Sequence, residues 1–237
     1  YYLPLPIKNI RYIKQSLKLF NFLGLNVTVP YKKKIIGHLD SIDKSAKDIN
    51  AVNTLLCKNN KIKGYNTDII GFKKGLLNKK WNKNRPVIIF GAGGASEAVI
   101  YFLKSENINN ITIINRTKNN AAKIIKRYKN IKFDYRANKH LKEAGLIVNT
   151  TSLGMIGYPD LKVELNKVNK EAIIYDIVYN PINTNLIREA NKYKLTNITG
   201  LEMFIEQARA SFFIWFDIQP EINSKLITSI KKRINKA

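Results

Sequence analysis

Residues 87–95 read Val87-Ile-Ile-Phe-Gly-Ala-Gly-Gly-Ala95, which is a run of four apolar residues followed by a glycine-rich turn. The apolar run predicts a buried strand, and apolar residues at helical spacing after it predict a helix. Glycines at such a turn let the backbone approach a pyrophosphate, and the first N–H groups of the helix can bind its charge. Glycine-rich turns also occur for packing alone. If the turn is functional, the residues that bind a dinucleotide are Gly91, Ala92, Gly93, Gly94 and Ala95.

The same rhythm continues as far as residue 200. It begins after a polar segment at 78–86 that suits a linker and ends in Pro86. Strands are expected at 87–90, 111–115, 131–133, 146–149, 173–177 and 195–199, and helices over 95–103, 118–128 and 185–193. Strands that alternate with helices of this length predict an α/β fold with a doubly wound parallel sheet over residues 81–200.

Residues 1–80 have a different pattern. The expected elements are a helix over 10–22, a strand over 26–29 closed by Pro30, a hairpin of strands 51–57 and 62–66, and a helix over 69–77 capped by 66–68. This pattern predicts a second, smaller α/β domain. A long helix is expected after Gly200, within a third segment at 201–237.

The residues after the second strand of the parallel sheet indicate which dinucleotide is bound. NAD-binding proteins usually carry an acidic residue there, which holds the ribose 2′-OH and repels a 2′-phosphate. This chain has Asn115-Arg116-Thr117-Lys118, with two cations and no acid. Arg116 can pair with phosphate while Asn115 and Thr117 hydrogen-bond to it, which favours NADP(H), although these residues could merely cap the next helix. Glu97 would repel the nucleotide phosphates, so we expect its side chain to point away from them.

The composition excludes several classes of protein. The net charge of +24 invites a nucleic-acid interpretation, but the lysines are scattered in twos and threes, so we expect no nucleic-acid partner. No apolar run approaches the roughly 20 residues of a membrane-spanning helix. The single Cys57 excludes an intrachain disulfide and suits the cytoplasm. No metal-ligand spacing occurs, so no metal is expected.

Eight ordered motifs identify a family, and the match extends from about residue 20 to 217. They are Asn26-Val-Thr-Val-Pro-Tyr-Lys32, Ala51-Val-Asn-Thr54, Gly64-Tyr-Asn-Thr-Asp68, Gly91-Ala-Gly-Gly-Ala95, Asn115-Arg-Thr117, Asn149-Thr-Thr-Ser152, Tyr175-Asp-Ile-Val-Tyr179 and Gly200-Leu-Glu-Met-Phe-Ile-Glu-Gln207. Together they resemble shikimate dehydrogenase. The resemblance implies a substrate domain over 1–80, a Rossmann-type NADP domain over 81–200, and C-terminal helices over 201–237 that return to the substrate domain. The implied reaction is NADPH-dependent reduction of 3-dehydroshikimate to shikimate, on the pathway to chorismate and the aromatic amino acids.

The resemblance also assigns residues. Lys32 becomes the general acid with Asp68 beside it, although without the family these two would be a surface lysine and a helix cap. The residues expected to contact the substrate are Thr28, Asn53, Tyr179 and Gln207. Those expected to contact the cofactor near the nicotinamide, besides the turn at 91–95, are Thr151, Ser152, Ile177, Gly200 and Met203. His38, His140 and Cys57 match no motif and are expected to be structural.

One part of the family pattern is missing. The family begins with a strand and a Ser-x-Ser motif that binds the substrate carboxylate, and neither precedes Tyr1. We therefore expect an incomplete substrate domain, with an open sheet edge and weak shikimate binding. Alternatives are a quinate/shikimate dehydrogenase, a tetrapyrrole-pathway reductase, and a non-catalytic relic or basic nucleic-acid-binding module. The chain is expected to be a monomer or a homodimer.

Overall fold

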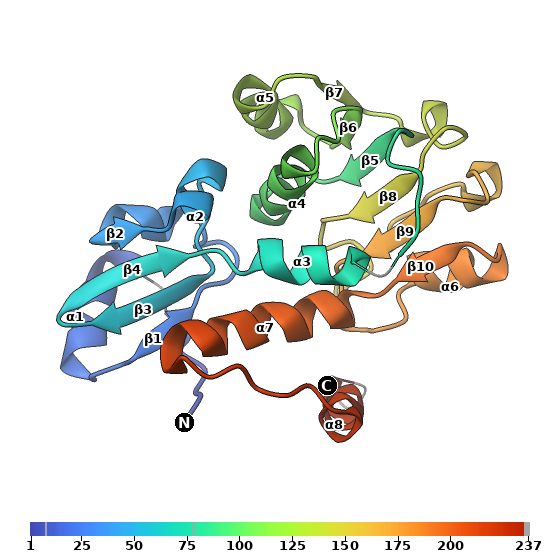
Figure 1. The fold of residues 1–237 in the computed structure, drawn as a ribbon. Coiled ribbons are helices and arrows are strands. Elements are labelled where there is room, and N and C mark those ends of the chain that lie inside the picture. The colour runs from blue at the N-terminus through green and yellow to red at the C-terminus, as the bar shows by residue number, and fades with distance from the viewer. Residues whose placement is uncertain (8, 78, 235–237) are drawn as a thin grey trace.

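The computed structural model of the protein describes residues 1–7, 9–77 and 79–234 and contains two sheets (Figure 1). The first has four strands in the order β1-β3-β4-β2, with bounds β1 Gly24–Asn26, β3 Thr54–Lys58, β4 Lys61–Tyr65 and β2 Ser41–Ile42. β3 is antiparallel to β1 and β4, and β2 is parallel to β4. The expected hairpin is confirmed, with Asn59 and Asn60 both in the left-handed region.

The second sheet has six strands, all parallel, in the order β10-β9-β8-β5-β6-β7. Their bounds are β5 Val87–Phe90, β6 Ile111–Ile114, β7 Ile131–Asp134, β8 Leu146–Asn149, β9 Ile173–Asp176 and β10 Thr196–Ile198. The order reverses between β5 and β8, as in doubly wound folds that bind dinucleotides at this switch point. The sequence prediction of an α/β fold with this sheet is confirmed.

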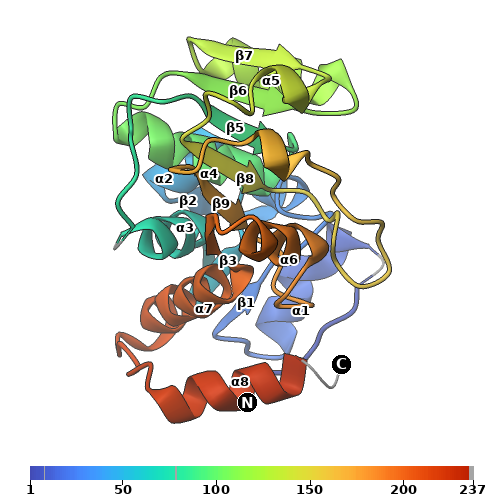
Figure 2. The same ribbon diagram turned by 90° about the vertical axis from the view of Figure 1, so that its right-hand side faces the viewer.

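Helices cover both faces of the second sheet (Figure 2). The side chains of α4 (Gly94–Ser105) and α5 (Lys118–Arg127) join one buried cluster with β5, β6 and β8. Those of α6 (Asn185–Lys192) join a second cluster on the opposite face. The first sheet has a core of its own, in which Leu55 of β3 packs with Ile13 and Leu17 of α1 (Ile13–Leu19) and Ala46 of α2 (Lys44–Ile49).

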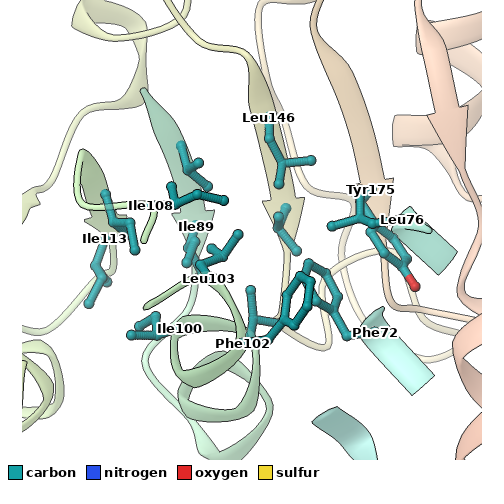
Figure 3. Close-up of a cluster of buried hydrophobic side chains, with 14 of the residues drawn as sticks. Phe72, Leu76, Ile89, Ile100, Phe102, Leu103, Ile108, Ile113, Leu146 and Tyr175 are labelled. Carbon is teal, nitrogen blue, oxygen red and sulfur yellow. The ribbon is translucent and has the colours of Figure 1, made fainter. Parts of the chain in front are cut away.

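Two long-range neighbours, α3 (Asp68–Leu76) and α7 (Gly200–Phe216), lie side by side and connect the two sheets (Figure 1). The ring of Phe72 from α3 stacks on Tyr175 of β9 at 4.7 Å and meets Phe102 of α4 edge-on (Figure 3). At the other end of α7, Trp215 donates a hydrogen bond of 2.8 Å to the carbonyl of Leu55 in the first sheet. The last helix, α8 (Ser224–Ile234), buries none of its residues.

The structure corrects several sequence-based boundaries. The strand expected over 26–29 is β1, Gly24–Asn26, because the chain turns away after Val27, where Tyr31 N–H bonds to the carbonyl of Thr28. The helix expected over 10–22 is a 3₁₀ turn at Ile10–Tyr12 followed by α1. Residues 34–49, for which the sequence predicts no element, hold a 3₁₀ turn at Lys34–His38, β2 and α2. Part of the expected linker, residue 78, lies outside the described residues.

Candidate active site

A cavity of about 270 Å³ lies between the first sheet, the start of α4 and the first turns of α7. Nine residues that the sequence analysis singled out line it: Thr28, Lys32, Asn53, Asp68, Ala95, Ile177, Tyr179, Met203 and Gln207. Four others that it did not single out complete the lining: Tyr2, Asn26, Val27 and Phe204. Asn26, Val27 and Phe204 belong to the quoted motifs, so motif membership could have found them. Tyr2 carries no such signal.

Lys32 and Asp68 form an ion pair at the floor of this cavity. Lys32 Nζ donates to Asp68 Oδ2 at 2.6 Å, and the Asp68 side chain is only 8% exposed. The second carboxylate oxygen accepts a hydrogen bond of 2.8 Å from Asn53 Nδ2. Asn53 is itself held, because its Oδ1 accepts the backbone N–H of Thr67 at 2.8 Å. The ammonium is therefore fixed by a carboxylate whose own orientation is fixed from the opposite side.

A group of buried hydroxyls lies behind Asn53 and Asp68. Ser211 Oγ of α7 is hydrogen-bonded to Thr54 Oγ1 at 2.8 Å and to Thr67 Oγ1 at 3.2 Å. Asn26 Nδ2 donates to both Thr54 Oγ1 and Ser211 Oγ. These contacts tie α7 to the two segments that carry Asn53 and Asp68. The sequence placed Ser211 on this helix but gave no signal for its partners, because they lie more than 140 positions away.

The glycine-rich turn has the shape that a dinucleotide requires. Gly91 has φ +106°, a conformation that glycine adopts readily, and its Cα faces Thr150 and Thr151 so closely that no side chain would fit. At Gly93 an added Cβ would meet nothing within 4 Å, which leaves open space for a ligand. Gly93 also precedes α4 without a side-chain cap, so the first N–H groups of the helix are available to an anion.

The residues expected to hold the 2′-phosphate lie at the end of β6. Arg116 and Thr117 are exposed, and Asn115 Nδ2 donates to the carbonyl of Thr117 at 2.7 Å. Thr117 directly precedes α5 but makes no side-chain cap bond. The competing interpretation, in which these side chains serve as a helix cap, therefore has no support from Thr117.

The remaining predicted cofactor residues gather at the carboxyl ends of β8 and β9. Thr151 Oγ1 donates to Asn149 Oδ1 at 2.7 Å, and Ser152 is exposed beside it. Gly200 begins α7 where an added Cβ would lie 2.3 Å from the carbonyl oxygen of Ile177. This close approach brings Met203 and Gln207 to the cavity. Tyr179 lies across from them, with its ring stacked on Phe204 at 4.2 Å.

Asp176, at the end of β9, holds together the segments that follow β8 and β9. It is fully buried, and it accepts hydrogen bonds from Asn149 Nδ2, Thr184 Oγ1 and Val178 N–H. Burial raises the pKa of the Asp176 carboxyl, and these hydrogen bonds oppose the rise only in part. Asp176 belongs to the motif Tyr175-Asp-Ile-Val-Tyr179, but the sequence alone predicts no role for it.

Within residues 1–7, 9–77 and 79–234 no helix is long and apolar enough to cross a membrane. Over the same residues no three or more His, Cys, Asp or Glu side chains cluster as metal ligands would. His140 lies 3.1 Å from Asp134 Oδ2, and burial raises the pKa of the Cys57 thiol. None of His38, His140 and Cys57 lines the cavity.

Three family models match the chain. They describe the shikimate dehydrogenase substrate binding domain over residues 1–55, shikimate/quinate 5-dehydrogenase over 76–204, and the shikimate 5′-dehydrogenase C-terminal domain over 200–223. Among curated proteins, the shikimate dehydrogenase (NADP(+)) of Methanococcus maripaludis is 40% identical over 91% of this chain and 80% of its own length.

Solved structures agree. Shikimate 5-dehydrogenase from Thermus thermophilus, in complex with NADP(H) and shikimate, matches with a TM-score of 0.84 and 28% identity. That match covers 97% of this chain and 85% of the other. Quinate dehydrogenase from Corynebacterium glutamicum, in complex with NAD, has a TM-score of 0.83 over 97% of this chain and 83% of its own. Its identity of 24% shows a shared fold alone.

Proposed function

The chain belongs to the shikimate dehydrogenase family, and we propose that it catalyses the NADPH-dependent reduction of 3-dehydroshikimate to shikimate, a step in aromatic amino acid biosynthesis. One observation carries this proposal beyond family membership. The Lys32–Asp68 pair lies in the same cavity as Ala95 of the glycine-rich turn, so a proton donor and a dinucleotide site meet at one place.

Bound NADPH would supply the hydride that the carbonyl carbon receives. Lys32 would donate its proton to the carbonyl oxygen as negative charge develops there, and its positive charge would stabilise that oxygen. Asp68 would hold the lysine in place and accept a hydrogen bond from a substrate hydroxyl. Thr28, Asn53 and Gln207 offer further hydrogen-bonding groups to a polyhydroxylated ring, and Tyr179 would close the cavity against it.

The cofactor would lie along the carboxyl ends of the parallel strands. The turn formed by Gly91, Ala92, Gly93, Gly94 and Ala95 would receive the pyrophosphate at the start of α4. Asn115, Arg116 and Thr117 would bind the 2′-phosphate. Near the nicotinamide the contacts would come from Thr151, Ser152, Ile177, Gly200 and Met203. This path implies the division of the chain that the sequence predicts, with a substrate part over 1–80, a nucleotide part over 81–200 and returning C-terminal helices.

The main alternative is a quinate/shikimate dehydrogenase. The absence of an acidic residue at 115–118 favours NADP and disfavours the NAD-preferring relatives. The expectations of a monomer or homodimer, of a cytoplasmic location and of no nucleic-acid partner stay predictions. Retention on heparin above about 0.5 M salt would contradict the last, because diffuse phosphate contacts weaken steeply with salt.

The deciding experiment follows formation of the reduced cofactor, NADPH or NADH, at 340 nm with four pairings of shikimate or quinate with NADP or NAD. We expect shikimate with NADP to be the best pair. A preference for quinate with NAD would move the chain to the alternative, and no turnover with any pair would contradict both.

A further inference from the structure

Glu97 is a buried carboxylate with two cationic partners. It lies in the first turn of α4, and its side chain is 1% exposed. Lys33 Nζ donates to Glu97 Oε1 and Arg127 Nη1 donates to Glu97 Oε2. Each carboxylate oxygen therefore has its own cation, and the two cations come from distant parts of the chain.

These partners belong to opposite sides of the active site. Lys33 follows the proposed catalytic lysine directly in the chain. Arg127 lies at the end of α5 in the nucleotide part and reaches across to donate a 3.0 Å hydrogen bond to the carbonyl of Ile49. Next to Glu97, Ala98 packs in a small buried cluster with Ile49 and Ala51. Glu97 thus stands where the two halves of the molecule touch.

The same contact region includes Lys32. A Cβ on Gly94 would lie 3.8 Å from Lys32 Cδ and 3.7 Å from the Cβ of Ala51, so the aliphatic part of the lysine lies close to the glycine-rich turn. The carbonyl of Lys32 accepts a 2.8 Å hydrogen bond from Val52 N–H. Any shift of Lys33 or of the segment at 49–52 would therefore move Lys32 relative to the turn.

We propose that Glu97 is a positioning residue that acts through Lys33 and Arg127 to hold Lys32 at a fixed place over the glycine-rich turn. This inference rests on the proposed function, because it concerns the alignment of the proton donor with the nucleotide. Displacements of about 1 Å at such a site can cost roughly 100-fold in rate. Glu97 does not line the cavity, so it is not a catalytic residue.

Because Glu97 is negatively charged, its replacement should affect kcat and cofactor binding in different ways. A carboxylate in the first turn of a helix that binds a pyrophosphate repels the ligand. Glu97→Gln removes that repulsion and leaves Lys33 and Arg127 facing a neutral group. We expect kcat to fall by about 10-fold or more, while KM for NADP stays unchanged or decreases. The variant should fold, because the Lys33 and Arg127 side chains are 42% and 33% exposed and water can solvate them.

Matched lysine variants complete the test. Lys33→Met removes one of the two partners, so kcat should fall at least about 3-fold, and Lys33→Arg should restore it. Lys34→Met is the control, because Lys34 is the next residue of the same triplet, is exposed, and has no ion pair among the described residues. It should keep the parent kcat.

The outcomes are distinguishable. If the parent protein does not turn over shikimate with NADP, the proposed function fails. If the parent is active while Glu97→Gln and Lys33→Met keep its kcat and only lower the melting temperature, Glu97 serves stability alone and the inference is overturned. A rise in KM for NADP as the sole effect would also overturn it. Should Glu97→Gln fail to fold, the comparison of Lys33→Met with Lys34→Met decides.

Discussion

Lys32 Nζ lies 2.6 Å from Asp68 Oδ2 although the two residues are 36 positions apart, and Asn53 bonds to the other carboxylate oxygen. These three residues come from separate segments: Lys32 from the turn after β1, Asn53 from the position before β3, and Asp68 from the start of α3. An ion pair held from both sides in this way has little freedom to rotate, which suits proton delivery to a fixed point.

Replacing Lys32, the proposed proton donor, should abolish most activity. For Lys32→Ala we expect kcat to fall by about 10²- to 10⁴-fold, the usual contribution of a general acid. The dissociation constant for NADPH, measured by fluorescence titration, should stay the same. Lys34→Ala serves as the control and should match the parent. Unchanged turnover in Lys32→Ala would show that Lys32 is not the general acid.

Asp68→Asn should weaken the site in a different way. The amide can no longer form an ion pair with Lys32, and hydrogen bonds to charged groups contribute about 1.5–3 kcal/mol. We expect kcat/KM for shikimate to fall roughly 10- to 100-fold, with a part of the loss in KM because a hydroxyl contact is lost. An effect on kcat alone would mean that Asp68 orients Lys32 without touching the substrate.

The cofactor preference should depend on half-buried Asn115 and exposed Arg116. Asn115→Asp combined with Arg116→Ile introduces a carboxylate for the ribose 2′-OH and removes the cation for the 2′-phosphate. Steady-state kinetics with both cofactors should then show a shift in kcat/KM from NADP toward NAD. Lys126→Gln, which removes an exposed charge from the following helix α5, should leave the preference as it is. If the double variant keeps its preference for NADP, the 2′-phosphate must be bound by other residues.

Asp176 should impose a pH dependence on stability. Its pKa in the folded protein is raised above the ordinary 3.8, so the folded state binds the proton more tightly than the unfolded state. Protonated Asp176 therefore favours folding, and this contribution is lost as pH rises from 3.8 through the raised pKa. The melting temperature of Asp176→Asn relative to the parent should increase between pH 4 and pH 7. With Asp160→Asn, at an exposed residue, the difference should stay flat.

Gly200 should tolerate no side chain. In Gly200→Ala the new Cβ would lie 2.3 Å from the carbonyl oxygen of Ile177, so the start of α7 would have to move. Overpacking of this kind typically costs about 1–3 kcal/mol of unfolding free energy, measurable by urea denaturation. Since α7 carries Met203 and Gln207, KM for shikimate should rise as well. Gly37→Ala, where a Cβ would meet nothing within 4 Å, is the matched control.

The sequence predicts those parts of the fold whose signal is local. The parallel strands are short apolar runs, and Gly91 to Ala95 follow one of them directly, so pattern alone was sufficient. Residues 34–49 gave no such signal, because the elements there are short: a 3₁₀ turn of five residues, a strand of two and a helix of six. Two groups of contacts were also beyond the sequence: Ser211 with Thr54 and Thr67, and Glu97 with Lys33 and Arg127. They join side chains from separate segments, and only the folded chain brings these segments together.

Helix α3 has a consequence for how the protein folds. Its first residue is Asp68, in the cavity, and one turn later Phe72 stacks on Tyr175 in the core of the second sheet. The position of the carboxylate therefore depends on that ring, and loss of the packing around Phe72 should disturb the cavity as well. A fragment that ends near residue 80 would expose Phe72 and leave α3 without most of its packing partners. Gene fusions or splits at this apparent boundary should therefore yield aggregation-prone pieces rather than an independently folding substrate module.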